Sequence, residues 1–410
     1  PGAQAFGVDT GSEDWSVRFD NTVKYNYGVR TESADKRMLG TPNNNDGDYN
    51  FRKAGTNITN RVDLLTELDV IYQGSMGFRV STASWYDKAY ENTGSNSNPF
   101  VNGNGDTSGI NPSLNGLPGT GTPLGSSHLS NYAQRYYNGP SGEVLDAFVF
   151  ARTEIGDSSE LSGKLGQHNL FWGETLLNPV HSLSYGQSGL DLAKLAASPG
   201  TEAKELFVPR NQLSTSFLVN SELTLGAQYF FDWDAARLPE AGTYYGSSDV
   251  VGEGAQSFLL GHTGTPGLIP VRGALTTIRR GEDLTPDKSG DWGVMAKWSP
   301  EWLGGTLGFY YRNTSDPTPA VLINAPNLHT GSLEGTSYMT AYADDIDIYG
   351  ISLAKSVGPV SVGLDVNYRE NMPLISNFTT INGPLYQALA GTAGGTNLIG
   401  EVPGNGETGL

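Results

Sequence analysis

The stretch LSGKLGQH (residues 161–168), followed by NLFWGE (residues 169–174), decides how the rest of the sequence is interpreted. Its residues alternate between two sets, and this period of two predicts a β-strand with two different faces. Asn178-Pro179 ends the pattern, because proline has no N–H for a β-ladder and holds the preceding residue in extended geometry. The alternation resumes after Pro209. We therefore predict two strands separated by a non-strand insert, residues 174–209.

The insert has a helix-like segment at residues 190–197 and a charged run, Glu202-Ala203-Lys204-Glu205, before Pro209. If the flanking strands belong to a barrel, such an insert can lie only in the lumen, at the rim or outside. Its position then decides the function of the protein.

The composition favours an all-β chain with long loops. The 410 residues include 54 Gly and 20 Tyr, and only 17% are charged. No apolar run reaches the 18 or so residues that a transmembrane helix needs, so a membrane location requires a β-barrel. One barrel can accommodate this length. The absence of Cys suits a protein that crosses an oxidising periplasm.

Eleven segments show the period of two and are predicted as strands. They are residues 15–30, 57–72, 76–90, 143–155, 161–168, 212–219, 222–233, 292–298, 306–312, 346–355 and 360–369. Alternation alone fits both a soluble sandwich and a membrane barrel, but the first run is about fourteen residues, longer than a usual globular strand. We expect an antiparallel transmembrane β-barrel of about 14–16 strands in the complete protein. Its lipid-facing residues should include Val17, Tyr25, Leu225, Tyr229, Val362 and Leu364.

Three long segments lack any period: residues 91–142, 235–289 and 371–410. Long loops at one end of a barrel and short turns at the other are typical of outer-membrane proteins. Ala3-Gln4-Ala5 matches the end of a secretory signal, so residues 1–5 are interpreted as its remnant. Residues 6–410 are expected to form a single barrel whose closing strands follow residue 410.

The formal net charge of −18 argues against a nucleic-acid partner, which would need basic surface. Two acidic groups, Asp46 with Asp48 and Asp344-Asp345 with Asp347, are candidates for cation binding. Neither has the full calcium-loop pattern. We expect solvated carboxylates and no metal site or cofactor.

No enzyme activity is predicted. YGQSG (residues 185–189) is one residue out of the G-x-S-x-G pattern, and GNGETG (residues 404–409) lacks the strand and helix of a dinucleotide-binding motif. Glu174 and His168 are close enough in the sequence to be considered as an acid–base pair, but a hydrogen bond at the barrel rim is the simpler interpretation.

Several motifs taken together resemble a large, uncharacterised family of Gram-negative outer-membrane proteins. They are GQHNLFWGE (166–174), Asn178-Pro179, Pro199-Gly200-x-Glu202-x-Lys204, Pro209, Gly242-Thr243-Tyr244, GFYY (308–311) and YRENMPL (368–374). The family often shows G-R-Q-x-x-x-W-G-E-S. Here Gln167 directly follows Gly166 and Thr175 replaces the Ser, so the family's arginine is absent.

The resemblance implies a β-barrel in the bacterial outer membrane, surrounded by lipids and lipopolysaccharide. It implies, more loosely, a partnership with inner-membrane exporters of the resistance-nodulation-division class and a periplasmic lipid-carrier-like protein, because the genes of these proteins are often neighbours. It brings no enzyme activity.

From these observations we expect a barrel, partly occluded by its own inserts, that passes or accepts hydrophobic or amphiphilic small molecules or lipids. The candidate residues of the lumen or plug are Trp172, Glu174, Asn178, Glu202, Lys204, Phe148, Phe150 and Phe230. The three Phe side chains either line the lumen or pack against the insert. The alternatives are a general diffusion porin for polar solutes and an outer-membrane lipid hydrolase. The hydrolase would need a Ser–His pair that the sequence does not display.

Overall fold

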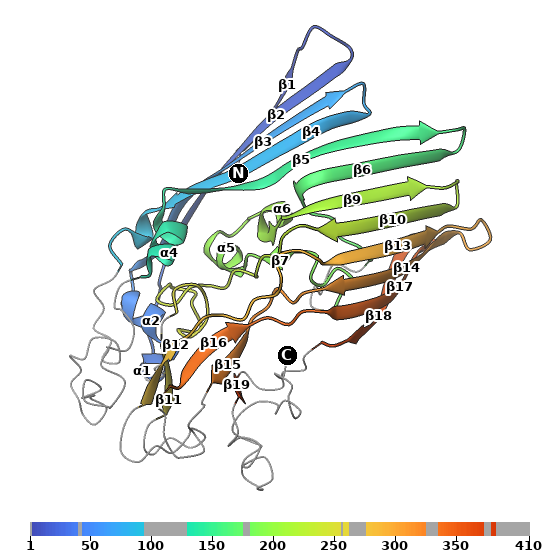
Figure 1. Ribbon diagram of the computed structural model, residues 1–410. Coiled ribbons are helices and arrows are strands. Elements are labelled where there is room, and N and C mark those ends of the chain that lie inside the picture. The colour runs from blue at the N-terminus through green and yellow to red at the C-terminus, as the bar shows by residue number, and fades with distance from the viewer. Residues whose placement is uncertain are drawn as a thin grey trace.

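The computed structural model describes residues 2–39, 43–93, 129–174, 181–255, 257–261, 276–324, 335–372 and 379–382. Its main element is a curved sheet of 12 strands in which each strand pairs antiparallel with its neighbours (Figure 1). The strands are β1 (Gly2–Val8), β2 (Trp15–Val29), β3 (Asn57–Tyr72), β4 (Met76–Asp87), β5 (Ser141–Ile155), β6 (Ser159–His168), β9 (Arg210–Leu218), β10 (Leu223–Phe230), β13 (Trp292–Trp298), β14 (Gly305–Thr314), β17 (Ile346–Val357) and β18 (Val360–Glu370). Within the described residues, β1 and β18 are the two edges and do not pair with each other.

The all-β, antiparallel prediction is confirmed. The eleven strands of the large sheet other than β1 correspond to the eleven predicted strands. Residues 88–90, predicted as strand, instead form the 3-10 helix η1 (Lys88–Tyr90), because the Asp87 side chain accepts the N–H of Ala89 and caps it. β1 was not predicted. It includes residues 2–5, interpreted above as the end of a signal, and pairs Phe6 with Phe19 of β2.

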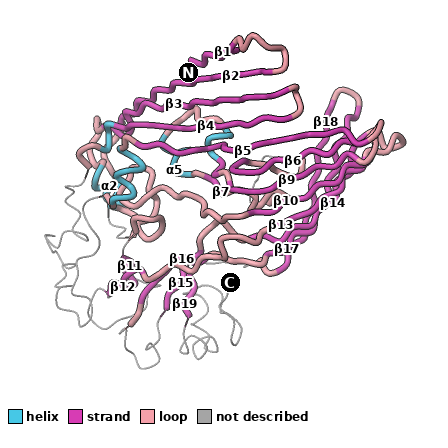
Figure 2. The backbone as a smooth tube through the Cα atoms, turned by 45° about the horizontal axis from the view of Figure 1, so that its top comes forward, coloured by secondary structure: helices cyan, strands magenta, loops and turns pink. Residues whose placement is uncertain are grey.

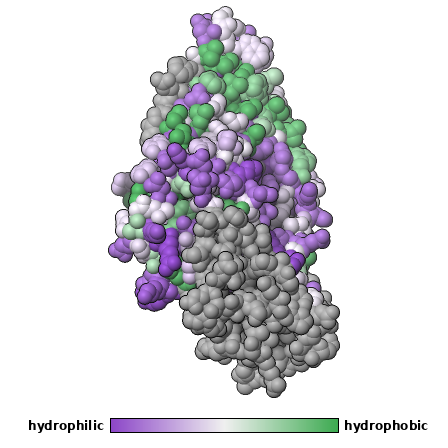
Figure 3. All heavy atoms as spheres, turned by 90° about the vertical axis from the view of Figure 1, so that its left-hand side faces the viewer, coloured by the Kyte–Doolittle hydropathy of each residue, from purple (hydrophilic) through white to green (hydrophobic). Residues whose placement is uncertain are grey.

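The two faces of the sheet have opposite character, and the apolar one is exposed. Tyr25 is 62% exposed and Leu364 51%, and Leu225, Tyr229 and Val362 are exposed as well, while Val17 is half-buried. Figure 3 shows hydrophobic residues gathered in one continuous area on one side of the molecule. The other face carries buried charges such as Arg61, which is 1% exposed. A soluble sandwich has the reverse arrangement.

The structure also contains a second, smaller sheet of five strands. It has the order β11 (Ser257–Gly261), β12 (Thr276–Arg280), β16 (Ser337–Ala341), β15 (Ala320–Asn324) and β19 (Thr379–Asn382). The prediction that residues 235–289 and 371–410 are irregular is therefore wrong at β11, β12 and β19. These strands have at most five residues, and two of the pairings are parallel, so no hairpin signal marks them.

Several short helices lie in the segments between the strands. They are α1 (Lys36–Leu39), α2 (Asp46–Asn50), α4 (Asn131–Ala133), the π-helix η3 (Gln134–Asn138), α5 (Leu192–Ala197) and α6 (Ala203–Leu206). The long segment 91–142 is thus helical at 131–138, and its residues 94–128 lie outside the described residues. None of the described helices has the length and apolar character to cross a membrane.

The predicted helix-like segment of the insert is confirmed as α5. The Asp191 side chain accepts the N–H of Lys194 at its N-terminus, and the sequence LAKLAA has high helix propensity. α6 begins with a capping box between Glu202 and Glu205. A two-stranded ladder of β7 (Gly189–Leu190) and β8 (Phe207–Val208) holds the two ends of this helical part together.

Candidate functional site

The described residues 169–174 and 181–209, called the insert from here on, lie on the concave side of the large sheet (Figure 2). On one side the insert is bound to the first strands. The Lys24 ammonium of β2 lies 2.7 Å from a Glu205 carboxylate oxygen of α6, and Lys204 lies 2.6 Å from Glu67 of β3. Ser198 donates to Asp63 of β3 at 3.3 Å. These partners come from alternate positions on the concave face of each strand.

Lys194 of α5 is the most buried lysine on this side, with 2% of its surface exposed. Its ammonium binds Glu143 of β5 and lies 5.1 Å from the ring centroid of Trp85. Arg237 binds the same Glu143 and lies 3.1 Å from Asp191. Buried charges are tolerated only when paired, so this network requires α5 to occupy its observed position.

Three arginines, Arg210, Arg312 and Arg369, hold the insert on the opposite side and are called the arginine clamp. They donate hydrogen bonds to backbone carbonyls of residues 182–186. Arg210 reaches Gly186 O at 3.0 Å, Arg312 reaches Leu183 O at 3.1 Å and Tyr185 O at 2.5 Å, and Arg369 reaches Ser182 O at 3.0 Å. The clamp comes from β9, β14 and β18, so the insert is tied to both halves of the sheet.

Close packing accompanies the clamp. Leu183 is completely buried and occupies the space above Gly350 of β17. A Cβ atom at position 350 would lie 1.9 Å from Leu183 Cδ2, so this strand position needs glycine while Leu183 stays in place. Gly186 has φ +74°, a left-handed conformation, and a Cβ atom there would also meet the Thr314 side chain at 2.6 Å.

The insert residues predicted for the plug have different environments. Trp172 is buried and packs on Tyr310 with 6.0 Å between ring centroids, and its backbone N–H donates to Gln187 Oε1 at 2.8 Å. Glu174 lies 3.4 Å from Lys297 of β13. Glu202 is exposed and pairs with Lys204 at 3.2 Å. Asn178 lies outside the described residues.

The three predicted Phe side chains divide into two kinds. Phe230 is 1% exposed and lies under the Arg210 guanidinium, whose Cζ is 4.1 Å from the ring centroid. The residue over its ring therefore belongs to β9 and not to the insert. Phe148 and Phe150 are half-buried on the concave face of β5, with 6.3 Å between ring centroids. These two rings remain partly accessible.

Glu174 and His168 do not form a pair. His168 Nε2 lies 2.8 Å from Ser214 Oγ, and Nδ1 lies 2.9 Å from Gly166 O. The two side chains come from adjacent strands, β6 and β9, and only the strand pairing brings them together. This is a Ser–His contact of the kind that a hydrolase needs, but Ser214 is 5% exposed, so its hydroxyl is not presented to a substrate.

The acidic groups have internal partners. Asp48 lies 3.0 Å from Arg30, and Asp347 accepts from the Tyr311 hydroxyl at 2.8 Å. Asp249 Oδ2 accepts the backbone N–H of Asn45 at 2.7 Å and of Asp46 at 3.2 Å, so that the α2 segment docks on the 240–254 loop. Among the described residues, no group of three or more His, Asp or Glu side chains is arranged to hold a metal ion.

Docking of the α2 segment is expected to weaken as the pH rises. Burial, followed by the charge of nearby Asp46, raises the pKa of Asp249 from its ordinary 3.8 to about 7. The docked loop then binds a proton more tightly than the free loop, so docking is strongest below pH 4 and is lost as the pH rises through 7. Exchange protection of the Asn45 and Asp46 amides, corrected for intrinsic rates, should fall about a hundredfold between pH 5 and pH 8, because pH 5 lies two units below the raised pKa.

The control for this pH dependence is Asp249→Asn, which keeps an oxygen acceptor but cannot titrate. Its protection factors should be flat over the same range. A decrease of equal size in the variant would assign the effect to other groups near the loop, such as Glu240, whose pKa burial also raises to about 7.

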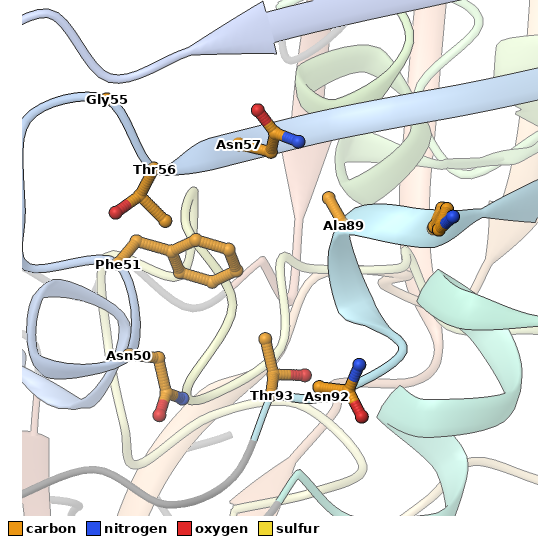
Figure 4. Close-up of a pocket in the computed structure, with 9 residues that line it drawn as sticks. Asn50, Phe51, Gly55, Thr56, Asn57, Ala89, Asn92 and Thr93 are labelled. Atoms are coloured by element: carbon orange, nitrogen blue, oxygen red, sulfur yellow. The ribbon is translucent and has the colours of Figure 1, made fainter.

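A cavity of about 420 Å³ opens near the start of β3 (Figure 4). Its lining is mainly polar and includes Asn57, Lys88, Asn92 and Thr93, with Phe51 at its wall. Nothing in the sequence singled out these residues. Small-molecule sites are usually lined by apolar side chains, so this cavity is a weaker candidate than the concave face.

A family model described as "Protein of unknown function (DUF1302)" matches residues 1–404. The chain belongs to this family. The resemblance to an uncharacterised family is thereby confirmed, whereas the G-[RQ]-x-x-x-x-W-G-E-[ST] motif and the neighbouring exporter genes stay predictions. In this DUF1302 protein the motif region, residues 166–174, forms the end of β6 and the entry to the insert.

Other comparisons add little for this DUF1302 protein. No protein of curated function matches it. Among solved structures, it is similar to the ferric-catecholate import receptor Fiu from E. coli K12, with 10% identity and a TM-score of 0.21. The match covers 92% of this chain and 50% of that one, so the chain spans about half the length of the receptor. A TM-score of this size does not establish a shared fold.

Proposed function

We propose that this DUF1302 protein is an outer-membrane β-barrel, occluded by its own insert, that passes or accepts hydrophobic or amphiphilic small molecules or lipids. The observation that carries the proposal is the attachment of the insert to both halves of the concave face, through Lys24 and Lys204 on one side and the arginine clamp on the other. A barrel with such an insert lacks the open aqueous path of a simple porin.

The membrane location is supported by the exposed apolar face. Side chains such as Tyr25 and Leu364 are exposed in the part of the chain that the structure describes, and lipid is the solvent that suits them. On the opposite face, charged groups such as Lys24, Glu67 and Arg79 are paired inside the protein. Closure of the sheet by further strands, outer-membrane lipids and lipopolysaccharide around it, and a total of about 14–16 strands belong to this proposal.

The porin alternative is favoured by one observation, the many acidic side chains on the concave face of β3 and β5. These carboxylates are, however, neutralised within the protein. Arg79 binds Glu67 and lies 3.0 Å from both Asp69 and Asp146. An acidic lining that is already paired offers little attraction to a passing cation.

Two further parts of the proposal, the transport partners and the lack of enzyme activity, rest on the family resemblance and on the burial of Ser214. Partnership with a resistance-nodulation-division exporter and a periplasmic lipid-carrier-like protein would supply or remove an amphiphile on the periplasmic side. Enzyme activity is not part of the proposal, and the burial of Ser214 argues against hydrolysis at His168.

Conductance and ligand binding, measured on one preparation, test this function. The purified protein in planar bilayers should conduct small ions poorly, because the insert excludes water from the lumen. The same protein in lipid nanodiscs should bind a fluorescent fatty acid. High, steady conductance without fatty-acid binding would support the porin instead.

A further inference from the structure

Three side chains on the concave face of β5 and β6 form a small amphiphilic surface, called the Lys164 patch: Phe148, Phe150 and Lys164. The Lys164 ammonium lies 5.1 Å from the ring centroid of Phe148, and Lys164 is opposite Phe150 in the strand pairing. Both rings are half-buried and the lysine is exposed. The patch therefore combines accessible aromatic carbon with a positive charge.

Lys164 differs from the other lysines on this side of the sheet in its lack of a carboxylate. Lys24 pairs with Glu205, Lys194 with Glu143, Lys204 with Glu67, and Lys297 with Glu174. Within the part of the chain that the structure describes, Lys164 has no ion pair. An exposed ammonium without a carboxylate partner attracts an external anion even in a protein whose overall charge is negative.

The walls of the patch are fixed by neighbouring contacts. The His168 ring lies 5.3 Å from Phe148 and is held by its hydrogen bond to Ser214. One residue further, Asn169 donates to the carbonyl of Phe207 at 3.3 Å, and Phe207 packs on Phe171 with 4.4 Å between centroids. Half-buried aromatic surface thus continues from β5 into the insert.

We propose that the Lys164 patch binds the carboxylate end of a single-chain anionic amphiphile, whose hydrocarbon lies over Phe148 and Phe150. A small polar anion would leave the rings unused, and an uncharged hydrocarbon would leave the ammonium unused. This inference rests on the proposed function, because it names the substrate class of the same inner face. It assigns the headgroup to Lys164 and the chain to the aromatic rings.

The test compares two probes that differ only in charge: 11-(dansylamino)undecanoic acid and its methyl ester. Each is titrated into protein in lipid nanodiscs, with empty nanodiscs subtracted. The wild-type protein should bind the acid about three- to fivefold more tightly than the ester, the range expected for one partly exposed ion pair. Lys164→Met should abolish this preference and Lys164→Arg should keep it.

Two further variants separate charge from packing. Lys355→Met removes a lysine of β17 that lies on the outer face of the sheet, because it is in the same alternating set as Ile351. This variant should leave the preference for the acid over the ester unchanged. Phe148→Leu should weaken both probes equally. Equal binding of acid and ester by the wild type, or a preference that survives in Lys164→Met, overturns the inference while leaving the proposed function standing. Failure of both probes to bind contradicts the proposed function and the inference together.

Discussion

Replacing Arg312 by methionine is expected to lower the free energy of unfolding by about 3 kcal/mol and to raise ion conductance several-fold. Arg312 is 1% exposed and donates to the carbonyls of Leu183 and Tyr185. Methionine fills most of the volume of the arginine stem but provides no donor, so two buried carbonyls lose their partner. Urea unfolding in lipid vesicles measures the stability, and planar bilayers measure the conductance.

Arg152→Met is the matched control for this experiment. Arg152 also donates to a backbone carbonyl, that of Gly74 at 3.0 Å, but it is exposed at the turn end of β5. Its replacement should change stability by no more than about 0.5 kcal/mol and leave conductance unchanged. Equal effects of the two substitutions, or a neutral Arg312→Met, would show that the clamp does not hold the insert.

Gly350→Ala is expected to cost about 2 kcal/mol, because the added Cβ atom overlaps Leu183. Leu183→Ala alone should cost about 3 kcal/mol through the cavity it leaves. The double variant should be more stable than the sum of the two losses predicts, by at least about 1 kcal/mol, since the smaller side chain at 183 makes room for the new methyl group. Urea unfolding of all four proteins gives the coupling energy.

Gly163→Ala serves as the control for this cycle. An added Cβ there approaches no atom closer than 3.6 Å, so the substitution should be nearly neutral. Additive losses at positions 183 and 350 would mean that the insert moves away from β17 when either residue changes, which contradicts a rigidly held insert.

The large sheet was predictable because its strands are long and separate two different environments. In β3, for example, Arg61 and Asp63 are charged and buried, whereas the alternating residues Val62 and Leu64 are apolar and exposed. The short strands β11, β12, β15, β16 and β19 were missed because each has at most five residues and none is joined to its partner by a tight turn. β1 was missed because Gly2, Ala3 and Ala5 give it no apolar alternation.

The insert was also predictable from its flanking strands, but its contacts were not. Arg312 and the Leu183 carbonyl are 129 positions apart, and Lys24 and Glu205 are 181 apart. Which of these residues come into contact depends on the strand order and on the curvature of the sheet. No local sequence pattern predicts either of these. Lys164 could not be predicted as a binding residue, because it is distinguished by the lack of a carboxylate partner, which the sequence does not show.

The attachment of the insert to both halves of the sheet also imposes an order of assembly. When residues 169–209 follow β6 along the chain, the strands that bind α5 and α6 already precede them, so these contacts can form early. Two of the three clamp arginines, Arg312 and Arg369, belong to strands that follow the insert by more than a hundred residues. The insert would therefore form its contacts with β2, β3 and β5 first. The later strands β14, β17 and β18 would then pair and pack against an insert that is already in place.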